Sequence, residues 1–183
     1  MRFIFFALLL LVLSGCKNPT VIFETEIGNF EAEIFLDKAP ITSENFLNHI
    51  KENNFAGATF YRTVKLNNQP NNNIKILVVQ GGLDVDENKF PQIIHEPTNK
   101  TEIKHLDGTI SMARNEPGTA TTEFFICIGN QPELDFNGKR NPDGMGFAAF
   151  GKVIKGMNVV KKIHSSNDSL QRLKPPIKIL SIK

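Results

Sequence analysis

The chain has 183 residues, 40% of them hydrophobic and 22% charged, which is the composition of an ordinary globular protein of one domain. The net charge is only +2, and Lys and Arg form no cluster of the kind that binds nucleic acid, so we expect no nucleic-acid partner. The chain is long enough to bury a core without the help of metals or disulfides.

The first fifteen residues differ from the rest of the chain. Arg2 supplies a positive charge, and Phe3–Leu13 is an unbroken apolar run that is too short to span a bilayer. Such a pattern is typical of a secretory signal peptide. The run ends in Leu13-Ser14-Gly15-Cys16, which resembles the lipobox of bacterial lipoproteins, where the cysteine is lipidated and becomes the first residue of the mature chain. The alternative is an ordinary signal peptide followed by a chance cysteine.

We therefore expect a signal peptide at residues 1–15, lipidated Cys16 and a tether at residues 16–20, and one domain at residues 21–183. Several acyl chains on Cys16 would anchor the protein stably in the cell envelope, on its periplasmic side. Lys17 stands where an Asp would resemble an inner-membrane retention signal, which favours the outer membrane. Cys127 would be the one remaining thiol, so we expect no internal disulfide.

From Val21 onward the sequence has the two-residue period of β-strands. Val21–Thr25 and Phe30–Leu36 flank Gly28-Asn29, which is a reversal signal, and apolar residues alternate with glutamates in the second run. Pro40–Lys51 has apolar residues at helical spacing, a proline at its start and Thr or Ser available as a cap, and it predicts a helix.

The remainder of the chain is a succession of short strands with one further helix at Met157–His164. Long irregular stretches are predicted at Leu83–Asp107 and Gln131–Gly146, where prolines and turn residues are frequent. Many short strands with two helices indicate an all-β barrel or sandwich with helical caps. The predicted strands are Thr59–Val64, Ile74–Gln80, Thr109–Ala113, Glu123–Ile128, Phe150–Ile154 and Ile177–Ile182.

Common signatures of enzyme chemistry do not occur in this sequence. The histidines form no ligand pair at helical spacing, so we expect no metal site. The chain has neither a glycine-rich phosphate loop nor a nucleophile elbow. The residues taken one by one therefore indicate a β-domain without an assigned chemistry. The four histidines are His49, His95, His105 and His164.

Five segments, taken in order, resemble the motifs of the cyclophilins, and together they extend over roughly Thr20–Lys183. The turn-rich segment from Pro132 to Gly144 resembles the bacterial branch of this family. The resemblance implies a closed eight-stranded antiparallel β-barrel capped by two α-helices, and peptidyl-prolyl cis-trans isomerase activity that assists the folding of exported proteins. The five segments are Phe60-Tyr61-Arg62-Thr63-Val64, Val79-Gln80-Gly81-Gly82, Gly108-Thr109-Ile110-Ser111-Met112-Ala113-Arg114, Thr122-Glu123-Phe124-Phe125-Ile126-Cys127, and Phe150-Gly151-Lys152-Val153 with Gly156-Met157.

The resemblance assigns the catalytic role to Arg62. Twisting a prolyl peptide bond costs about 18–20 kcal/mol because amide resonance is lost. In the twisted state the prolyl nitrogen regains its lone pair, and a fixed hydrogen-bond donor then stabilises that state more than either planar one. Arginine suits this task because it is always charged and holds its donors in a rigid fork. No nucleophile, metal or organic cofactor enters this mechanism.

The resemblance also assigns residues to a pocket for the proline ring. Phe125 matches its aromatic floor, Val78 and Leu77 match its walls, and Leu134 and Phe147 match its rim. Strand alternation agrees with the assignment of the floor, because it puts Phe125 on the face opposite to its apolar neighbours in sequence. The alternative is that Phe125 belongs to the barrel core.

Four further residues are assigned to the substrate main chain. Gln80 matches the glutamine that holds the substrate backbone and steadies the arginine. Ala113, Arg114 and Asn115 match the segment that pairs with the substrate backbone, and Arg114 stands where many members have Asn. Because this pairing uses main-chain groups, the change to Arg114 need not impair it.

Glu123 is a departure from the family pattern, since the best-known members carry Gln at this position. An ionised carboxylate only accepts hydrogen bonds. It either pairs with Arg62 and positions it, or competes with the substrate for it, and we favour positioning.

A non-catalytic module that binds proline-containing segments on the same fold is the alternative function, and a purely structural envelope lipoprotein is a third. Retention of Arg62, Gln80 and Phe125 favours the enzyme. As partners we expect proline-containing polypeptides in unfolded or flexible segments, and we expect the protein itself to be a monomer.

Overall fold

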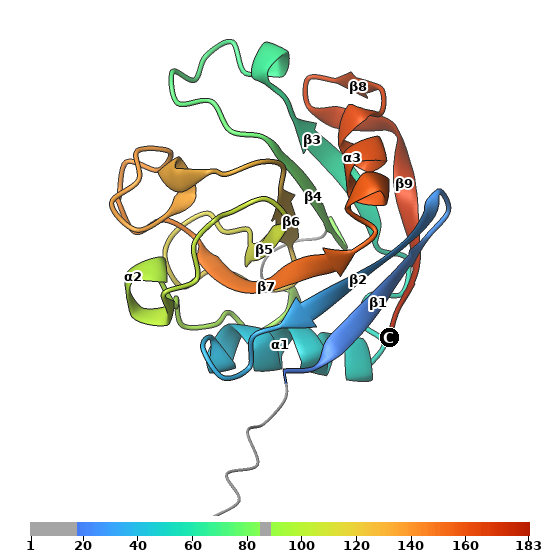
Figure 1. The fold of residues 1–183 in the computed structure, drawn as a ribbon, viewed down its shortest axis with the longest axis horizontal. Coiled ribbons are helices and arrows are strands. Elements are labelled where there is room, and N and C mark those ends of the chain that lie inside the picture. The colour runs from blue at the N-terminus through green and yellow to red at the C-terminus, as the bar shows by residue number, and fades with distance from the viewer. Residues whose placement is uncertain (1–17, 85–88) are drawn as a thin grey trace, which may run out of the picture.

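The computed structural model describes residues 18–84 and 89–183, so the predictions made for residues 1–15 and for Cys16 concern residues outside it. Eight strands form the wall of a barrel (Figure 1). They are β1 (Thr20–Thr25), β2 (Gly28–Ile34), β3 (Thr59–Val64), β4 (Val78–Gly82), β5 (Thr109–Met112), β6 (Phe124–Cys127), β7 (Ala148–Lys155) and β9 (Arg172–Ile182).

The strands follow one another around the wall in the order β1-β2-β7-β5-β6-β4-β3-β9, and pairing of β1 with β9 closes the circle. Every pairing is antiparallel. A further two-residue strand, β8 (Asp168–Ser169), forms a hairpin with the start of β9. The predicted closed eight-stranded antiparallel barrel is confirmed.

Three α-helices occur in the described residues, where the sequence predicted two. α1 (Pro40–Lys51) and α3 (Met157–Ser165) lie at the predicted positions, on different sides of the barrel in Figure 1. α2 (Thr98–Thr101) is a single turn within the segment that we predicted to be irregular. None of the helices in residues 18–84 and 89–183 is long and apolar enough to cross a membrane.

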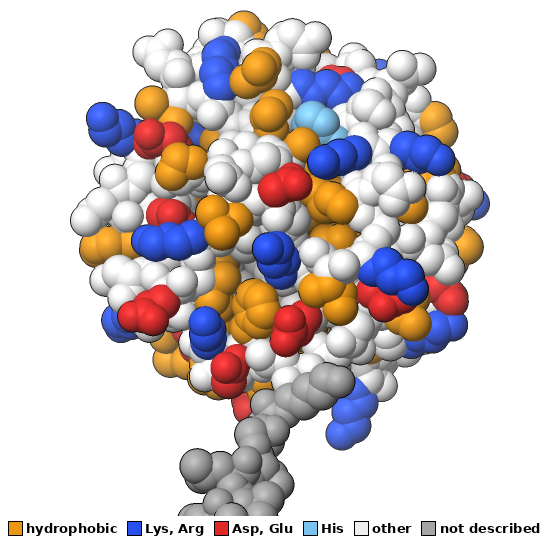
Figure 2. All heavy atoms as spheres, in the orientation of Figure 1, with side chains coloured by type: hydrophobic (Ala, Val, Ile, Leu, Met, Phe, Trp, Pro, Cys, Tyr) orange, Lys and Arg blue, Asp and Glu red, His pale blue; other side chains and the backbone are white. Residues whose placement is uncertain are grey.

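Phenylalanine side chains fill the inside of the barrel. The rings of Phe23 and Phe30 stack at 4.5 Å, and the ring of Phe46, from α1, meets that of Phe124 edge-on at 5.6 Å. All four side chains are at most 1% exposed. Because the interior is a packed core, a ligand cannot bind there, and any site must lie on the outside of the wall. On the face shown in Figure 2, basic and acidic side chains of the described residues are interspersed.

The turn between β1 and β2 lies two residues earlier than predicted. Residues Glu26 and Ile27 form the turn, and Gly28 pairs with Thr25 as the first residue of β2. Gly28 has a φ of +136°, and a Cβ at this position would lie 3.0 Å from Val159 of α3. The glycine therefore serves the close packing of α3 on the hairpin and not the turn itself.

Two strand boundaries also differ from the prediction. β4 begins at Val78 and not at Ile74, because the backbone of this segment bonds to side chains: Gln69 Nε2 donates to Ile76 O at 2.8 Å, and Leu77 N donates to Gln131 Oε1 at 3.1 Å. β9 begins at Arg172, before Pro175 and Pro176. Its register with β3 shifts at that point, and the resulting bulge accommodates prolines that cannot donate to a ladder.

We predict that Gly28→Ala lowers the free energy of unfolding by about 1–3 kcal/mol, because a side chain is strained at this φ and meets Val159. Gly57→Ala is the matched control, since Gly57 also has a positive φ (+84°) but nothing lies within 4 Å of the position of its Cβ. Denaturant unfolding of the two variants measures the difference. A loss in Gly57→Ala as large as that in Gly28→Ala would contradict a role for the α3 contact.

Candidate functional site

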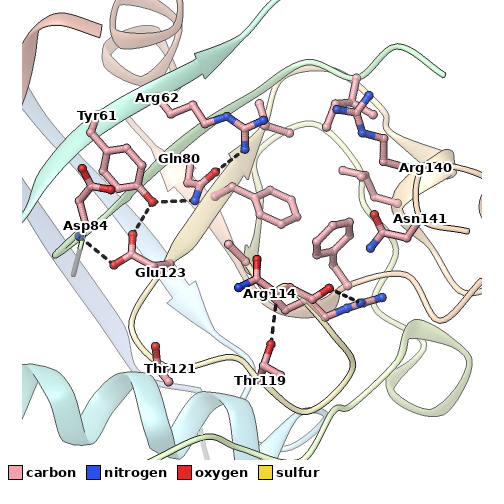
Figure 3. Close-up of a pocket in the computed structure, with 17 residues that line it drawn as sticks. Tyr61, Arg62, Gln80, Asp84, Arg114, Thr119, Thr121, Glu123, Arg140 and Asn141 are labelled. Atoms are coloured by element: carbon pink, nitrogen blue, oxygen red, sulfur yellow. Dashed lines mark hydrogen bonds between the residues drawn. The ribbon is translucent and has the colours of Figure 1, made fainter. Parts of the chain in front are cut away.

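A cavity of about 520 Å³ lies on the outer face of β3, β4 and β6 (Figure 3). In the strand ladders Arg62 of β3 is opposite Gln80 of β4, and Gln80 is opposite Phe125 of β6. Directly opposite residues of antiparallel strands point to the same face of a sheet. Register alone therefore brings these three side chains together, and all three line the cavity.

The apolar part of the cavity is a hydrophobic cluster separate from the barrel core. Phe125 is 4% exposed, and the ring of Phe147 meets it edge-on at 5.2 Å. Phe124, its neighbour in sequence, belongs to the core inside the barrel. Phe125 is therefore not part of the barrel core. The buried members of the outer cluster are Val64, Ile76, Val78, Phe125, Cys127 and Leu134, with Ala113 and Phe147 packed against them.

Leu77 does not line the cavity, and this prediction is corrected: the wall beside Val78 is formed by Ile76. Counting back from the Gln80 motif placed Leu77 there. Residues on one face of an extended segment recur every second position, so Gln80, Val78 and Ile76 share a face and Leu77 points away from it.

His105 supports the floor of the pocket from behind, and sequence analysis missed it. Its ring stacks on that of Phe125 at 6.0 Å between centroids and an interplanar angle of 15°. Nδ1 lies 2.8 Å from Asp135 Oδ1, and Nε2 lies 3.0 Å from Ser111 Oγ. Burial lowers the pKa of His105 despite the opposing effect of Asp135, so the ring is neutral at neutral pH and donates from Nδ1.

Ala113, Arg114 and Asn115 line the side of the cavity next to Phe147. The side chain of Arg114 is only 1% exposed and pairs with Asp143 at 2.8 Å. Its Nε also donates to Gly146 O at 2.9 Å. Arg114 therefore fixes the loop that follows Asn141, and its side chain is not available as a free cation.

The guanidinium of Arg62 is held by amide oxygens on two sides. Nη1 donates to Gln80 Oε1 at 2.8 Å, and Nε and Nη2 donate to Gln171 Oε1 at 3.0 and 2.7 Å. Burial lowers the pKa of Arg62, but an arginine remains charged at any physiological pH. Gln171 was not predicted, because it lies 109 residues away in the turn before β9 and belongs to no motif.

Glu123 does not touch Arg62, which corrects the expected direct pair. Two side chains lie between them, as Figure 3 shows. Tyr61 donates its phenol proton to Glu123 Oε2 at 2.5 Å, and Gln80 Nε2 donates to the oxygen of Tyr61 at 2.6 Å. The other amide atom of Gln80, its Oε1, then faces Arg62. The chain of hydrogen bonds runs in one direction, from the guanidinium to the carboxylate.

The carboxylate of Glu123 is fixed by its surroundings. Its Oε1 accepts the backbone N–H groups of Leu83 at 2.9 Å and Asp84 at 3.0 Å. A Cβ on Gly82 would lie 2.5 to 2.6 Å from this carboxylate, so only glycine fits there. Burial raises the pKa of Glu123, against the effect of its hydrogen bonds, and burial together with Glu123 raises the pKa of Tyr61. Tyr61 therefore stays protonated and can donate.

The chain matches a family model and many curated relatives. The model "Cyclophilin type peptidyl-prolyl cis-trans isomerase/CLD" matches residues 20–183. A peptidyl-prolyl cis-trans isomerase of Acinetobacter baylyi is 33% identical, over 96% of this chain and 90% of that protein. Peptidyl-prolyl cis-trans isomerase A of Dickeya dadantii is 34% identical, over 82% of this chain and 73% of that protein.

Solved structures agree with the fold. A crystal structure of a cyclophilin-type isomerase from Cryptosporidium parvum has a TM-score of 0.72 and 21% identity, and the match covers 89% of this chain and 94% of that one. A second structure of that protein, with the same TM-score, was determined in the presence of the dipeptide Ala-Pro. Family model, relatives and barrel together show that the chain belongs to the cyclophilin-type peptidyl-prolyl cis-trans isomerases and is an enzyme of that activity.

Proposed function

We propose that the cavity beside Arg62 binds X-Pro segments of exported proteins and interconverts their cis and trans forms, and that this assists their folding. The observation that carries the proposal is the fixed guanidinium that lines the same cavity as the apolar cluster around Phe125. The Cryptosporidium parvum structure that was determined in the presence of Ala-Pro supports a proline-containing substrate.

The apolar part of the cavity suits a proline ring in its chemistry. Phe125, Leu134 and Phe147 offer an apolar lining, and the ring of the substrate would displace water from it. Arg62 keeps two of its five N–H groups without a partner among residues 18–84 and 89–183, one on Nη1 and one on Nη2. One of these would donate to the prolyl nitrogen when the bond is twisted, and so stabilise the transition state selectively.

The first prediction of this proposal concerns Arg62. Arg62→Ala lowers kcat/KM for a proline peptide by about 10²–10³-fold, the usual effect of losing one donor to a developing charge. Arg62→Lys keeps the charge but loses the fork, and we expect an intermediate value. Peptide isomerisation rates of the purified protein measure both, with circular dichroism as the control for folding. A well-folded Arg62→Ala variant as fast as the parent would refute the role of Arg62 as the donor to the prolyl nitrogen.

The second prediction concerns the direction of the hydrogen-bond chain. Protonated Glu123 no longer forces Tyr61 to donate to it, so Gln80 loses its fixed orientation toward Arg62. Because burial raises the pKa of Glu123, kcat/KM should fall as the pH is lowered, and this fall should be centred at a pH above the pKa of an ordinary glutamate. Tyr61→Phe breaks the chain and should give a reduced rate without this acid limb.

The matched variant is Glu123→Gln, which cannot titrate. We expect it also to lack the acid limb and to be less active than the parent at neutral pH. A rise of tenfold or more in kcat/KM for Glu123→Gln would instead favour competition between Glu123 and the substrate, and would refute its role in positioning.

The third prediction concerns the anchor. We propose that Cys16 is lipidated and holds a monomeric enzyme in the bacterial cell envelope, on the periplasmic side and preferably at the outer membrane. The apolar run Phe3–Leu13 and the sequence Leu13-Ser14-Gly15-Cys16 support this. In a bacterium that processes lipoproteins, a labelled fatty acid should enter the parent and Cys127→Ser, whereas Cys16→Ser should stay unlabelled. Label in Cys16→Ser, or none in the parent, would refute the anchor.

A further inference from the structure

We propose that Gln171 is a positioning residue for the isomerisation, because it fixes the plane of the Arg62 guanidinium from the side that Gln80 does not reach. The inference rests on the proposed role of Arg62 as the donor to the prolyl nitrogen. Gln171 lies in the turn that joins β8 to β9, and its Oε1 accepts from both Nε and Nη2 of Arg62.

Two separate acceptors restrict a guanidinium more than one does. The N–H groups of Nε and Nη2 that meet Gln171 point in the same direction, so one oxygen between them holds a whole edge of the planar group. Gln80 alone contacts only Nη1 and would leave the group free to swing about that contact. With both glutamines in place, the remaining N–H groups on Nη1 and Nη2 keep a constant direction.

Gln171 is itself held on several sides. Its Nε2 donates to Asn68 O at 2.9 Å, and its backbone oxygen accepts from Thr63 N at 2.8 Å. The side chain of Asn68 donates to Asp168 Oδ2 at 3.0 Å, and Lys65 forms an ion pair with Asp168 at 2.8 Å. The hairpin of β8 and β9 is therefore tied to the segment that directly follows β3, the strand that carries Arg62.

The backbone at Gln171 is one that glutamine rarely adopts. Leu170 and Gln171 have φ values of +50° and +70°, and hairpin turns with two such residues favour Asn and Gly. Leu170 is 92% exposed and has no place in the core. From this backbone the amide of Gln171 reaches Arg62, a contact that Gly or the shorter Asn would not make.

Two variants of Gln171 separate positioning from stability. Gln171→Asn relieves the backbone strain, because Asn is favoured at this φ. It also shortens the side chain by one methylene, so the amide withdraws from Arg62. Gln171→Met keeps the length and the strained backbone but removes the acceptor oxygen. If Gln171 positions Arg62, both variants lose kcat by about tenfold or more while KM stays within twofold, whatever happens to the melting temperature. The Nε–H resonance of Arg62 also shifts in both NMR spectra.

Leu170→Asn is the matched control, because it relieves backbone strain at the neighbouring residue of the same turn and leaves the contact with Arg62 unchanged. We expect it to keep the parental kcat. A parental kcat in Gln171→Asn, with Arg62→Ala inactive, would overturn the role of Gln171 alone. If only the less stable of the two Gln171 variants lost kcat, the positioning role would also be overturned, because the loss would then follow stability. An active Arg62→Ala would instead refute the proposed donor on which the inference rests.

Discussion

The site depends on a chain of hydrogen bonds whose direction is fixed at both ends. Arg62 can only donate, and ionised Glu123 can only accept. Gln80 and Tyr61, which link them, therefore have a single consistent arrangement, with the amide oxygen toward the guanidinium and the phenol proton toward the carboxylate. An amide in place of Glu123 could either donate or accept, and the link to Arg62 would lose its fixed polarity.

The pairing register of the barrel strands determines which side chains meet. Adjacent residues of a strand point to opposite faces, so Phe124 enters the core while Phe125 forms part of the outer cluster. Phe60 and Arg62 would share a face of a regular strand, but the register of β3 shifts between them, so Phe60 lies in the core and Arg62 lines the cavity. Packing of the interior therefore holds the outer groups in place without any of the site residues having to contribute to the core.

Sequence predicts those parts of this molecule that local patterns determine. Alternation and the family motifs indicated the strands and the meeting of Arg62, Gln80 and Phe125. The error at Leu77 arose from counting back residue by residue from the Gln80 motif, where alternation alone would have indicated the residue before it. Contacts such as those of His105 and Gln171 could not be predicted, because they join segments that meet only when the barrel has closed.

The charge on Arg62 is held by neutral groups, and this matters for the proposed chemistry. A carboxylate in direct contact would position the guanidinium, but it would also neutralise the field at the place where the prolyl nitrogen gains its lone pair. Gln80 and Gln171 bind through amide oxygens and leave the positive charge uncompensated at the cavity. Glu123 acts through two intervening side chains, so it orients the amide without cancelling that charge. A site that must stabilise a transient lone pair is therefore better served by amides in contact with the arginine and a carboxylate kept at a distance.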